Sequence, residues 1–286
     1  MKIRTVFLLA AVISVSPAFA QDDDDDTEEE VIQKDVHPYL TDKFRFNAGI
    51  FSPEKKFKLS ADGTLTGDHP EYVFEESFGM SDTEGVFTAD FHWKFGKKWF
   101  FETQYYEVSS EGGKVLEEDF EWNDVVFPAG SFANAGISFD VWRMFFGREF
   151  ITTPNSEFAA GAGIHWLDIE AFVEGEILLD ESTTGFHHEE VGLEGPLPNI
   201  GFSYIYSTSP KWAFVTSVNW LSLSIDKWSG GFWDVSVGGN YQFTRHFGMS
   251  LQYLYLDLDV TYDDPDWSGD LDITFKGPYL SIGWSW

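Results

Sequence analysis

Residues 87–95 read Phe-Thr-Ala-Asp-Phe-His-Trp-Lys-Phe. The odd-numbered positions of this stretch carry aromatic or small apolar side chains, and the even-numbered positions carry polar or charged ones. Successive side chains of a β-strand point to opposite faces of a sheet, whereas a helix repeats every 3.6 residues. The stretch therefore predicts a β-strand with one apolar face and one polar face.

The same alternation recurs from Phe44 to the end of the chain, and no amphipathic helical pattern competes with it. Three predicted connections are long, at residues 54–83, 111–133 and 175–196, and the connections between them are tight turns such as 96–98 and 244–246. The ten predicted strands lie at about residues 43–53, 84–95, 99–110, 134–150, 156–174, 197–207, 212–225, 230–243, 247–262 and 270–286.

Composition helps to choose between a soluble β-sandwich and a membrane barrel. Aromatic residues make up 18% of the chain, with Phe 29, Trp 12 and Tyr 11, and the polar strand faces carry too many charges for an ordinary core. A mean hydropathy of −0.21 excludes a polytopic helical membrane protein. The apolar strand face fits contact with lipid, and the polar face fits a polar lumen. Only a closed barrel pairs every backbone N–H and C=O group inside the hydrocarbon layer of a membrane. We predict an all-β fold, a transmembrane antiparallel up-and-down β-barrel of about ten strands.

The charge balance excludes one class of partner. Lys and Arg number 18 against 48 Asp and Glu, a net charge of −30. Such a chain repels phosphate backbones, so we expect no nucleic acid partner. The absence of cysteine removes disulfides, thiolate metal sites and cysteine nucleophiles.

The N-terminus predicts export. Lys2 and Arg4 precede an apolar run, and Ala18-Phe19-Ala20 matches a signal peptidase site, so residues 1–20 are predicted to be a cleaved signal peptide. Acidic runs follow, and like charges that repel one another predict a disordered periplasmic segment at residues 21–42. The barrel is predicted at residues 43–286.

The last eight residues, Tyr-Leu-Ser-Ile-Gly-Trp-Ser-Trp, resemble the terminal strand signal of Gram-negative outer-membrane barrels. The alternating apolar positions and the aromatic last residue carry the resemblance: Leu280, Ile282, Trp284 and Trp286. The resemblance implies the cell outer membrane as the location and the barrel-assembly machinery as a partner. Ser281 stands where this signal often has glycine, and Lys276-Gly277-Pro278 interrupts the alternation, which predicts a bulge or kink.

Charged residues on the polar strand faces predict a closed lumen. About eight strands enclose a space that side chains fill, so ten strands leave little room, and buried charges must pair. We expect Arg45 to lie near Asp90, and Arg143 near Glu102 or Glu149, with no plug helix. A general porin is thereby excluded, while a narrow path for ions or a small hydrophobic ligand stays open. The predicted lumen network comprises Arg45, Asp90, His92, Lys94, Glu102, Arg143 and Glu149.

Acidic residues gather around the last predicted hairpin. Hard carboxylate oxygens suit Ca²⁺ or Mg²⁺, so diffuse binding of divalent cations is one interpretation, and a merely solubilising acidic surface is the other. The predicted rim comprises Asp257, Asp259, Asp263, Asp264, Asp266, Asp270 and Asp272.

Histidines supply the alternative chemistry. His165 with Asp168, or His69 with nearby acids, would give a base and its orienting group, although no nucleophile motif accompanies either. The pattern around His165 favours a hydrogen-bonded lumen histidine. Residues 187–190, His-His-Glu-Glu, contain metal-capable side chains in a predicted loop without fixed geometry, so no metal is assigned there.

The sequence thus favours a monomeric, non-enzymatic outer-membrane barrel with acidic extracellular loops, in contact with outer-membrane lipid and lipopolysaccharide. Its role is predicted to be structural, surface interaction or the passage of a narrow solute. The alternative is a hydrolase active at the outer rim, acting on protein or on lipid A. The omptin proteases are such ten-stranded enzymes, but their catalytic residues find no match in this sequence.

Overall fold

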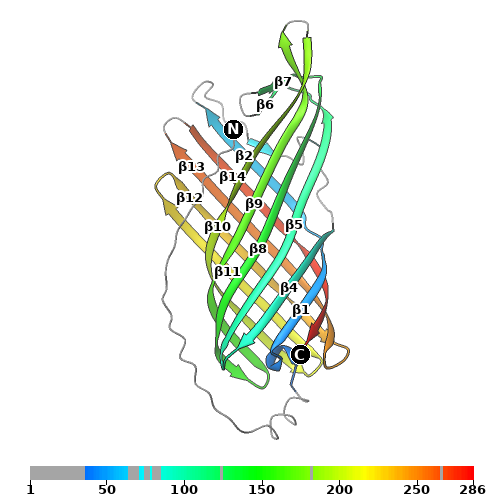
Figure 1. Ribbon diagram of the computed structural model, residues 1–286, viewed down its shortest axis with the longest axis vertical. Coiled ribbons are helices and arrows are strands. Elements are labelled where there is room, and N and C mark those ends of the chain that lie inside the picture. The colour runs from blue at the N-terminus through cyan, green and yellow to red at the C-terminus, as the bar shows by residue number, and fades with distance from the viewer. Residues whose placement is uncertain are drawn as a thin grey trace.

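The computed structural model describes residues 36–63, 71–73, 78, 85–122, 125–180, 183–264 and 267–286. Ten long strands form one antiparallel sheet that closes on itself through pairing of the first with the last (Figure 1), which confirms the predicted barrel. In order round the barrel they are β1 (Phe44–Phe51), β4 (Val86–Phe95), β5 (Trp99–Val115), β8 (Phe132–Thr153), β9 (Ser156–Asp180), β10 (Thr183–Ser209), β11 (Trp212–Ile225), β12 (Trp228–Gln242), β13 (Phe247–Asp264) and β14 (Trp267–Ser285).

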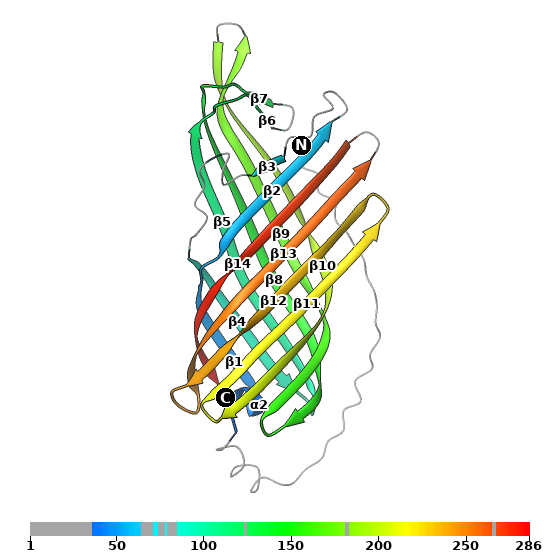
Figure 2. The same ribbon diagram turned by 180° about the vertical axis from the view of Figure 1, so that it is seen from behind.

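Five further elements complete the described chain. β2 (Glu54–Gly63) pairs with β14, β3 (Glu71–Val73) pairs with β2, and β6 (Phe120–Trp122) pairs with β7 (Val125–Phe127). The helix α2 (Pro38–Thr41) lies at the end of the barrel that holds the C-terminus (Figure 2). Within the described residues, no helix has the length and apolarity needed to cross a membrane.

The kink predicted at residues 276–278 lies on one side of β14 only. The β13–β14 register passes through Gly277 and Pro278 without a shift. On its other edge, β14 pairs with β2 over Trp267–Lys276 and with β1 over Tyr279–Ser285. β1 and β2 are therefore one line of chain interrupted at residues 52–53, and a side chain at Gly277 would collide with the carbonyl oxygen of Ser52.

The long strands extend further than the sequence predicted. Residues 175–196 are not a loop, because β9 continues to Asp180 and β10 begins at Thr183, so the two form a hairpin that projects beyond the rest of the barrel (Figure 1). Residues 111–115 likewise belong to β5, and residues 54–63 make up β2. The alternation of apolar and polar residues continues through these segments. The apolar residues, however, face the inside of the barrel there, whereas they face the outside in the other half; we call this switch the change of phase.

The change of phase occurs at one level of the barrel. On β9, Ile164 and Trp166 face outward, whereas Leu167 and Ile169 are buried inside. On most strands an exposed aromatic residue marks the level and is followed or preceded at once by an inward apolar residue. Such pairs are Tyr105-Tyr106, Val141-Trp142, Trp166-Leu167, Trp220-Leu221, Phe232-Trp233 and Tyr255-Leu256.

Below this level the outer surface is apolar and the lumen is polar. Phe87 and Phe214 each expose 63% of their surface, and Phe46, Leu251 and Ile282 are also exposed, while Arg45 and Asn47 are buried inside. Large apolar side chains exposed over a whole band identify the surface that contacts lipid. Aromatic residues at the level of the phase change are the side chains that favour a membrane interface.

Above this level the barrel continues as an extension with its own apolar core. Phe139 and Phe275 are fully buried and their rings meet with centroids 5.1 Å apart, and Phe57 meets Phe275 at 5.3 Å. The remaining inward residues include Val108, Ala133, Ala135, Ile137, Val141, Leu167, Ile169, Ala171, Val173, Phe232, Leu256, Leu258 and Ile273. The extension carries the long hairpins, so by the rule for such barrels it is the extracellular side.

Candidate functional site

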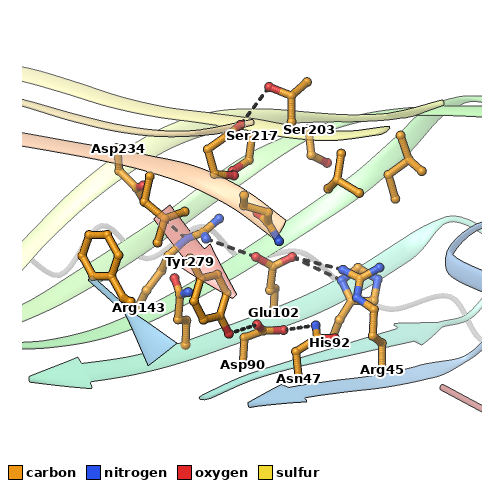
Figure 3. Close-up of a pocket in the computed structure, with 18 of the residues that line it drawn as sticks. Arg45, Asn47, Asp90, His92, Glu102, Arg143, Ser203, Ser217, Asp234 and Tyr279 are labelled. Carbon is orange, nitrogen blue, oxygen red and sulfur yellow. Dashed lines mark hydrogen bonds and ion pairs between the residues drawn. The ribbon is translucent and has the colours of Figure 1, made fainter. Parts of the chain in front are cut away.

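Glu102 occupies the centre of the polar half of the lumen (Figure 3). Arg143 Nη1 lies 3.1 Å from Glu102 Oε1, and Arg45 Nη2 lies 4.0 Å from Glu102 Oε2. His92 Nδ1 lies 3.3 Å from Glu102 Oε2. These side chains come from β1, β4, β5 and β8, and all point inward because they occupy the polar phase of their strands.

Asp90 does not pair with Arg45 as the sequence analysis predicted. Asn47 is its direct cross-strand neighbour and donates from Nδ2 to Asp90 Oδ2 at 2.6 Å, and Tyr279 donates to Oδ1 at 3.4 Å. Arg45 lies opposite His92 instead, one alternation further along, and reaches across to Glu102. The register between β1 and β4 thus determines which acid each basic residue meets.

A second cluster joins the opposite wall to Arg143. His165 Nε2 lies 3.2 Å from Asp234 Oδ2, and Asn199 Nδ2 lies 2.7 Å from the other ring nitrogen. Asn219 donates to the same Asp234 oxygen at 3.2 Å, and Arg143 Nε lies 3.9 Å from it. His165 is fully buried, so it is the hydrogen-bonded lumen histidine that the pattern favoured.

Lys94 forms a third cluster nearer the periplasmic rim. Its Nζ lies 3.0 Å from Glu149 Oε1 and also pairs with Glu157. Glu149, predicted as one of two possible partners of Arg143, forms an ion pair with Lys94 instead. Lys94 also donates to the backbone oxygen of Leu40 at 3.3 Å, which ties the cluster to α2.

The segment Val36–Asp42 plugs the periplasmic mouth, contrary to the expectation that residues 21–42 are disordered and that no plug exists. Residues 21–35 lie outside the described residues, but Tyr39 and Leu40 are buried. The plug contacts β11 and the end of β10 through a small apolar cluster with Ile205 and Ala213. This short apolar stretch follows an acidic run that predicts disorder, so the sequence pattern did not indicate that residues 36–42 are ordered.

A small cavity separates the plug from the extracellular core. It has about 80 Å³ of room for water, enough for a few molecules, since one needs at least ~10–15 Å³. Tyr39, Arg45, His92, Glu102 and Arg143 contribute to its lining. Arg45 Nε, His92 Nε2 and Arg143 Nε are buried without a hydrogen-bond partner among the described residues, and water in the cavity would satisfy them.

The rim residues do not form a compact site. His188 contacts Glu174 at 3.0 Å on the outer face of the β9–β10 hairpin, while His187 contacts Glu189 at 3.0 Å on the inner face. Neither pair lines the lumen cavity. Asp168 lies on the outer face, away from the buried His165, so these two do not pair, and His69 is outside the described residues.

Among the described residues, no group of three or more His, Asp or Glu side chains could hold a metal ion. Asp259 and Asp272 face each other directly across β13 and β14, and Asp257 and Asp270 accept from Thr274 and Thr261 on the neighbouring strand. Asp263 ends the row on β13, while Asp266, like the side chain of Asp264, lies outside the described part.

A row of acids that the sequence pattern did not reveal crosses the outer face just above the aromatic level. Glu107, Asp140, Asp168 and Glu194 are successive cross-strand neighbours on β5, β8, β9 and β10. The next row toward the membrane holds Tyr105, Trp142 and Trp166. Like charges directly opposite each other destabilise a sheet, so a cation bound beside this row would relieve the repulsion.

Comparisons with known proteins agree with this geometry. No protein-family model matches the chain, and no curated protein matches it. The outer membrane protease OmpT from Escherichia coli has a similar structure, with a TM-score of 0.54 and 10% identity over 85% of this chain and 97% of that chain. The fold is that of a small outer-membrane β-barrel.

The outer membrane protein OprG from Pseudomonas aeruginosa also matches, with a TM-score of 0.38 and 10% identity, covering 89% of this chain and 98% of that chain. Because the identity of this chain to OmpT is only 10%, that likeness concerns the fold alone, and no activity follows from it.

Several lumen residues were absent from the predicted network: Tyr39, Asn47, Glu157, His165, Asn199, Asn219, Asp234 and Tyr279. Most of them stand on the polar phase of a predicted strand, which is the signal that could have found them. Only the pairing of strands shows which of them meet.

Proposed function

We propose that this barrel acts through its outer surface, as a non-enzymatic envelope protein whose lumen is closed at rest. The closed lumen carries this proposal. Three ion-pair clusters cross the polar half, α2 fills the periplasmic mouth, and an apolar core fills the extracellular half. A solute would have to break buried ion pairs and then pass through packed aromatic rings, both of which are costly.

Conductance measurements test the closed lumen. We expect the purified protein in planar bilayers to show no large, steady conductance. Arg45→Ala should destabilise the barrel or open a small leak, because it removes the guanidinium that contacts Glu102 and covers the Tyr39 ring at 4.2 Å. A stable channel of high conductance in the unmutated protein would contradict the proposal and point to a diffusion porin.

The outer surface offers a partner in the lipid itself. The acidic row Glu107, Asp140, Asp168 and Glu194 lies beside the aromatic residues that mark the membrane level. Lipopolysaccharide phosphates are anionic too, so Ca²⁺ or Mg²⁺ would have to lie between the two. We infer that divalent cations bridge this surface to lipopolysaccharide, while the barrel-assembly machinery inserts the chain as a monomer.

Native mass spectrometry tests the lipid contact. The number of lipopolysaccharide molecules retained by the protein should fall after chelation. It should also fall when the four acids of the row are replaced by their amides, Glu107→Gln, Asp140→Asn, Asp168→Asn and Glu194→Gln. Four amide replacements in the N-terminal run Asp22–Asp26 change the net charge equally and serve as the control. Equal retention in all forms would contradict the bridged contact.

A further inference from the structure

Polar contacts as well as a small apolar cluster hold the plug to the barrel. The Tyr39 hydroxyl donates to Asn47 Oδ1 at 3.2 Å and accepts from Asn240 Nδ2 at 2.9 Å. Arg245, in the turn between β12 and β13, pairs with Asp42, with Nη1 2.8 Å from Oδ2. The apolar cluster that Tyr39 and Leu40 form with Ile205 and Ala213 is separate from the core of the extension, so undocking would free the segment without disturbing that core.

His37 caps α2 with an unusual group. Its Nδ1 accepts the backbone N–H of Tyr39 at 3.2 Å, in the position where Ser, Thr, Asp or Asn commonly supplies an oxygen. The ring is fully buried, and its Nε2 has no hydrogen-bond partner among the described residues. Because an accepting Nδ1 must be unprotonated, the cap exists only while His37 is neutral.

The groups around His37 disfavour its charged form. Burial is the largest cause, and the guanidiniums of Arg45 on β1 and Arg245 in the β12–β13 turn act in the same direction. Asn240 on β12 and Asp42 at the end of α2 favour the charged form but are outweighed. Together these groups lower the pKa of His37 from 6.5 to about 4.

We propose that Val36–Asp42 is an acid-released plug, in which a proton taken up by Nδ1 of His37 breaks the helix cap and undocks the segment. The new charge then lies beside Arg45 and Arg245, and the N–H on Nδ1 faces the N–H of Tyr39 that it used to accept. Tyr39 lines the lumen cavity, so its withdrawal opens that cavity to the periplasm. The apolar core beyond keeps the opened cavity a blind pocket.

The direction of the pH dependence follows from linkage. The undocked histidine titrates near 6.5 and the docked one near 4, so the undocked state binds more protons between these values. Docking is therefore at full strength above pH 6.5 and weakens by about tenfold for each pH unit down to pH 4. Below that the His37 effect is constant.

A spin label on the plug tests the proposal. The chain has no cysteine, so Thr41→Cys gives a single attachment site on α2. The nitroxide is attached at neutral pH, and its mobility is followed by electron paramagnetic resonance in lipid vesicles from pH 7.5 to 3.5. We expect an immobile label at pH 7.5 and a mobile fraction that grows between pH 6.5 and 4.

Two variants identify the titrating group. His37→Asn keeps a capping oxygen that cannot titrate, so its label should stay immobile throughout. Asp42→Asn removes the acid that pairs with Arg245, so it weakens docking, and its label should become mobile at a higher pH than in the unmutated sequence. A transition that persists in His37→Asn or never occurs in the unmutated sequence would overturn the proposal. So would a label already mobile at pH 7.5 in both His37→Asn and His37→Ser.

Discussion

Glu102 shows how one residue organises the lumen, because Arg45, His92 and Arg143 all lie within 4.0 Å of its carboxylate. Arg143 has a second acid, Asp234, near its Nε. The Arg143 guanidinium therefore links two walls of the barrel through the carboxylates of Glu102 and Asp234. Its positive charge compensates the negative charges of both buried acids.

Arg143→Ala should destabilise the barrel strongly. It leaves Glu102 and Asp234 with less positive charge in a buried space, and the loss of one partner of a buried pair costs ~3–5 kcal/mol. Unfolding by denaturant in lipid vesicles measures the change. Arg148→Ala is the matched control, since Arg148 lies outside over the Trp99 ring and its loss should cost only ~0.5–1 kcal/mol. Equal costs would contradict the buried network.

Phe91→Arg should damage the barrel on its lipid side. Phe91 belongs to the outward phase of β4 and stacks on Phe44 at 6.2 Å, and an arginine facing lipid at mid-membrane costs ~2–4 kcal/mol. Asp90→Asn, the adjacent inward residue, should have a much smaller effect because an amide can still accept from Tyr279. Equal effects in the same denaturant titration would show that the facing of β4 is misassigned.

At the scale of elements, β14 closes the barrel and ends the chain. Trp286 exchanges two backbone hydrogen bonds with Phe44, at 2.9 and 3.0 Å, and their rings stack at 5.5 Å. Trp286, the last residue of the segment that resembles an assembly signal, therefore also forms the last backbone pair between β1 and the end of the chain.

Deletion of Trp286 should therefore reduce insertion into the outer membrane. The deletion removes a rung of the β1–β14 pairing together with the aromatic last residue, whereas Trp286→Phe keeps both. The amount of folded protein in outer-membrane fractions, read by its heat-modifiable migration in electrophoresis, measures the effect. Unchanged levels of folded protein after the deletion would show that insertion does not depend on Trp286.

The extension behaves as a second element with its own core, and Phe275→Ala tests it. Phe275 is fully buried between Phe57 and Phe139, so its truncation should cost ~3–5 kcal/mol. Phe214→Ala removes a ring that is 63% exposed to lipid and should cost much less in a denaturant titration. A reversed order would contradict the change of phase at the membrane level.

For the whole molecule, the excess of acids over bases leads us to expect that divalent cations raise stability. Millimolar Ca²⁺ or Mg²⁺ should raise the melting temperature, since a ligand at 100 times its Kd stabilises the folded state by ~2.7 kcal/mol. Asp259→Asn with Asp272→Asn, which face each other across two strands, should reduce the gain. The same melting temperature with and without chelator would leave only the solubilising role of the acids.

The sequence by itself determined the barrel, because period-2 alternation, aromatic load and the terminal Trp286 each report on one residue and its neighbours. It determined equally that Arg45, Glu102 and Arg143 face inward, since facing follows from strand phase alone. It also contained the change of phase, at pairs such as Trp166-Leu167, although the predicted strands end at residues 110 and 174, and residues 111–133 and 175–196 are predicted to be loops.

Only the tertiary structure decided which inward residues meet. Arg45 reaches Glu102 rather than Asp90 because register and barrel closure set distances between strands that are remote in sequence. The plug was decided there as well: Tyr39 is an ordinary residue after an acidic run, and it becomes buried because Asn47, Ser250 and Asn240 arrive from three strands to bind its hydroxyl. Alternation fixes a direction for each side chain, whereas a contact needs two backbones brought together.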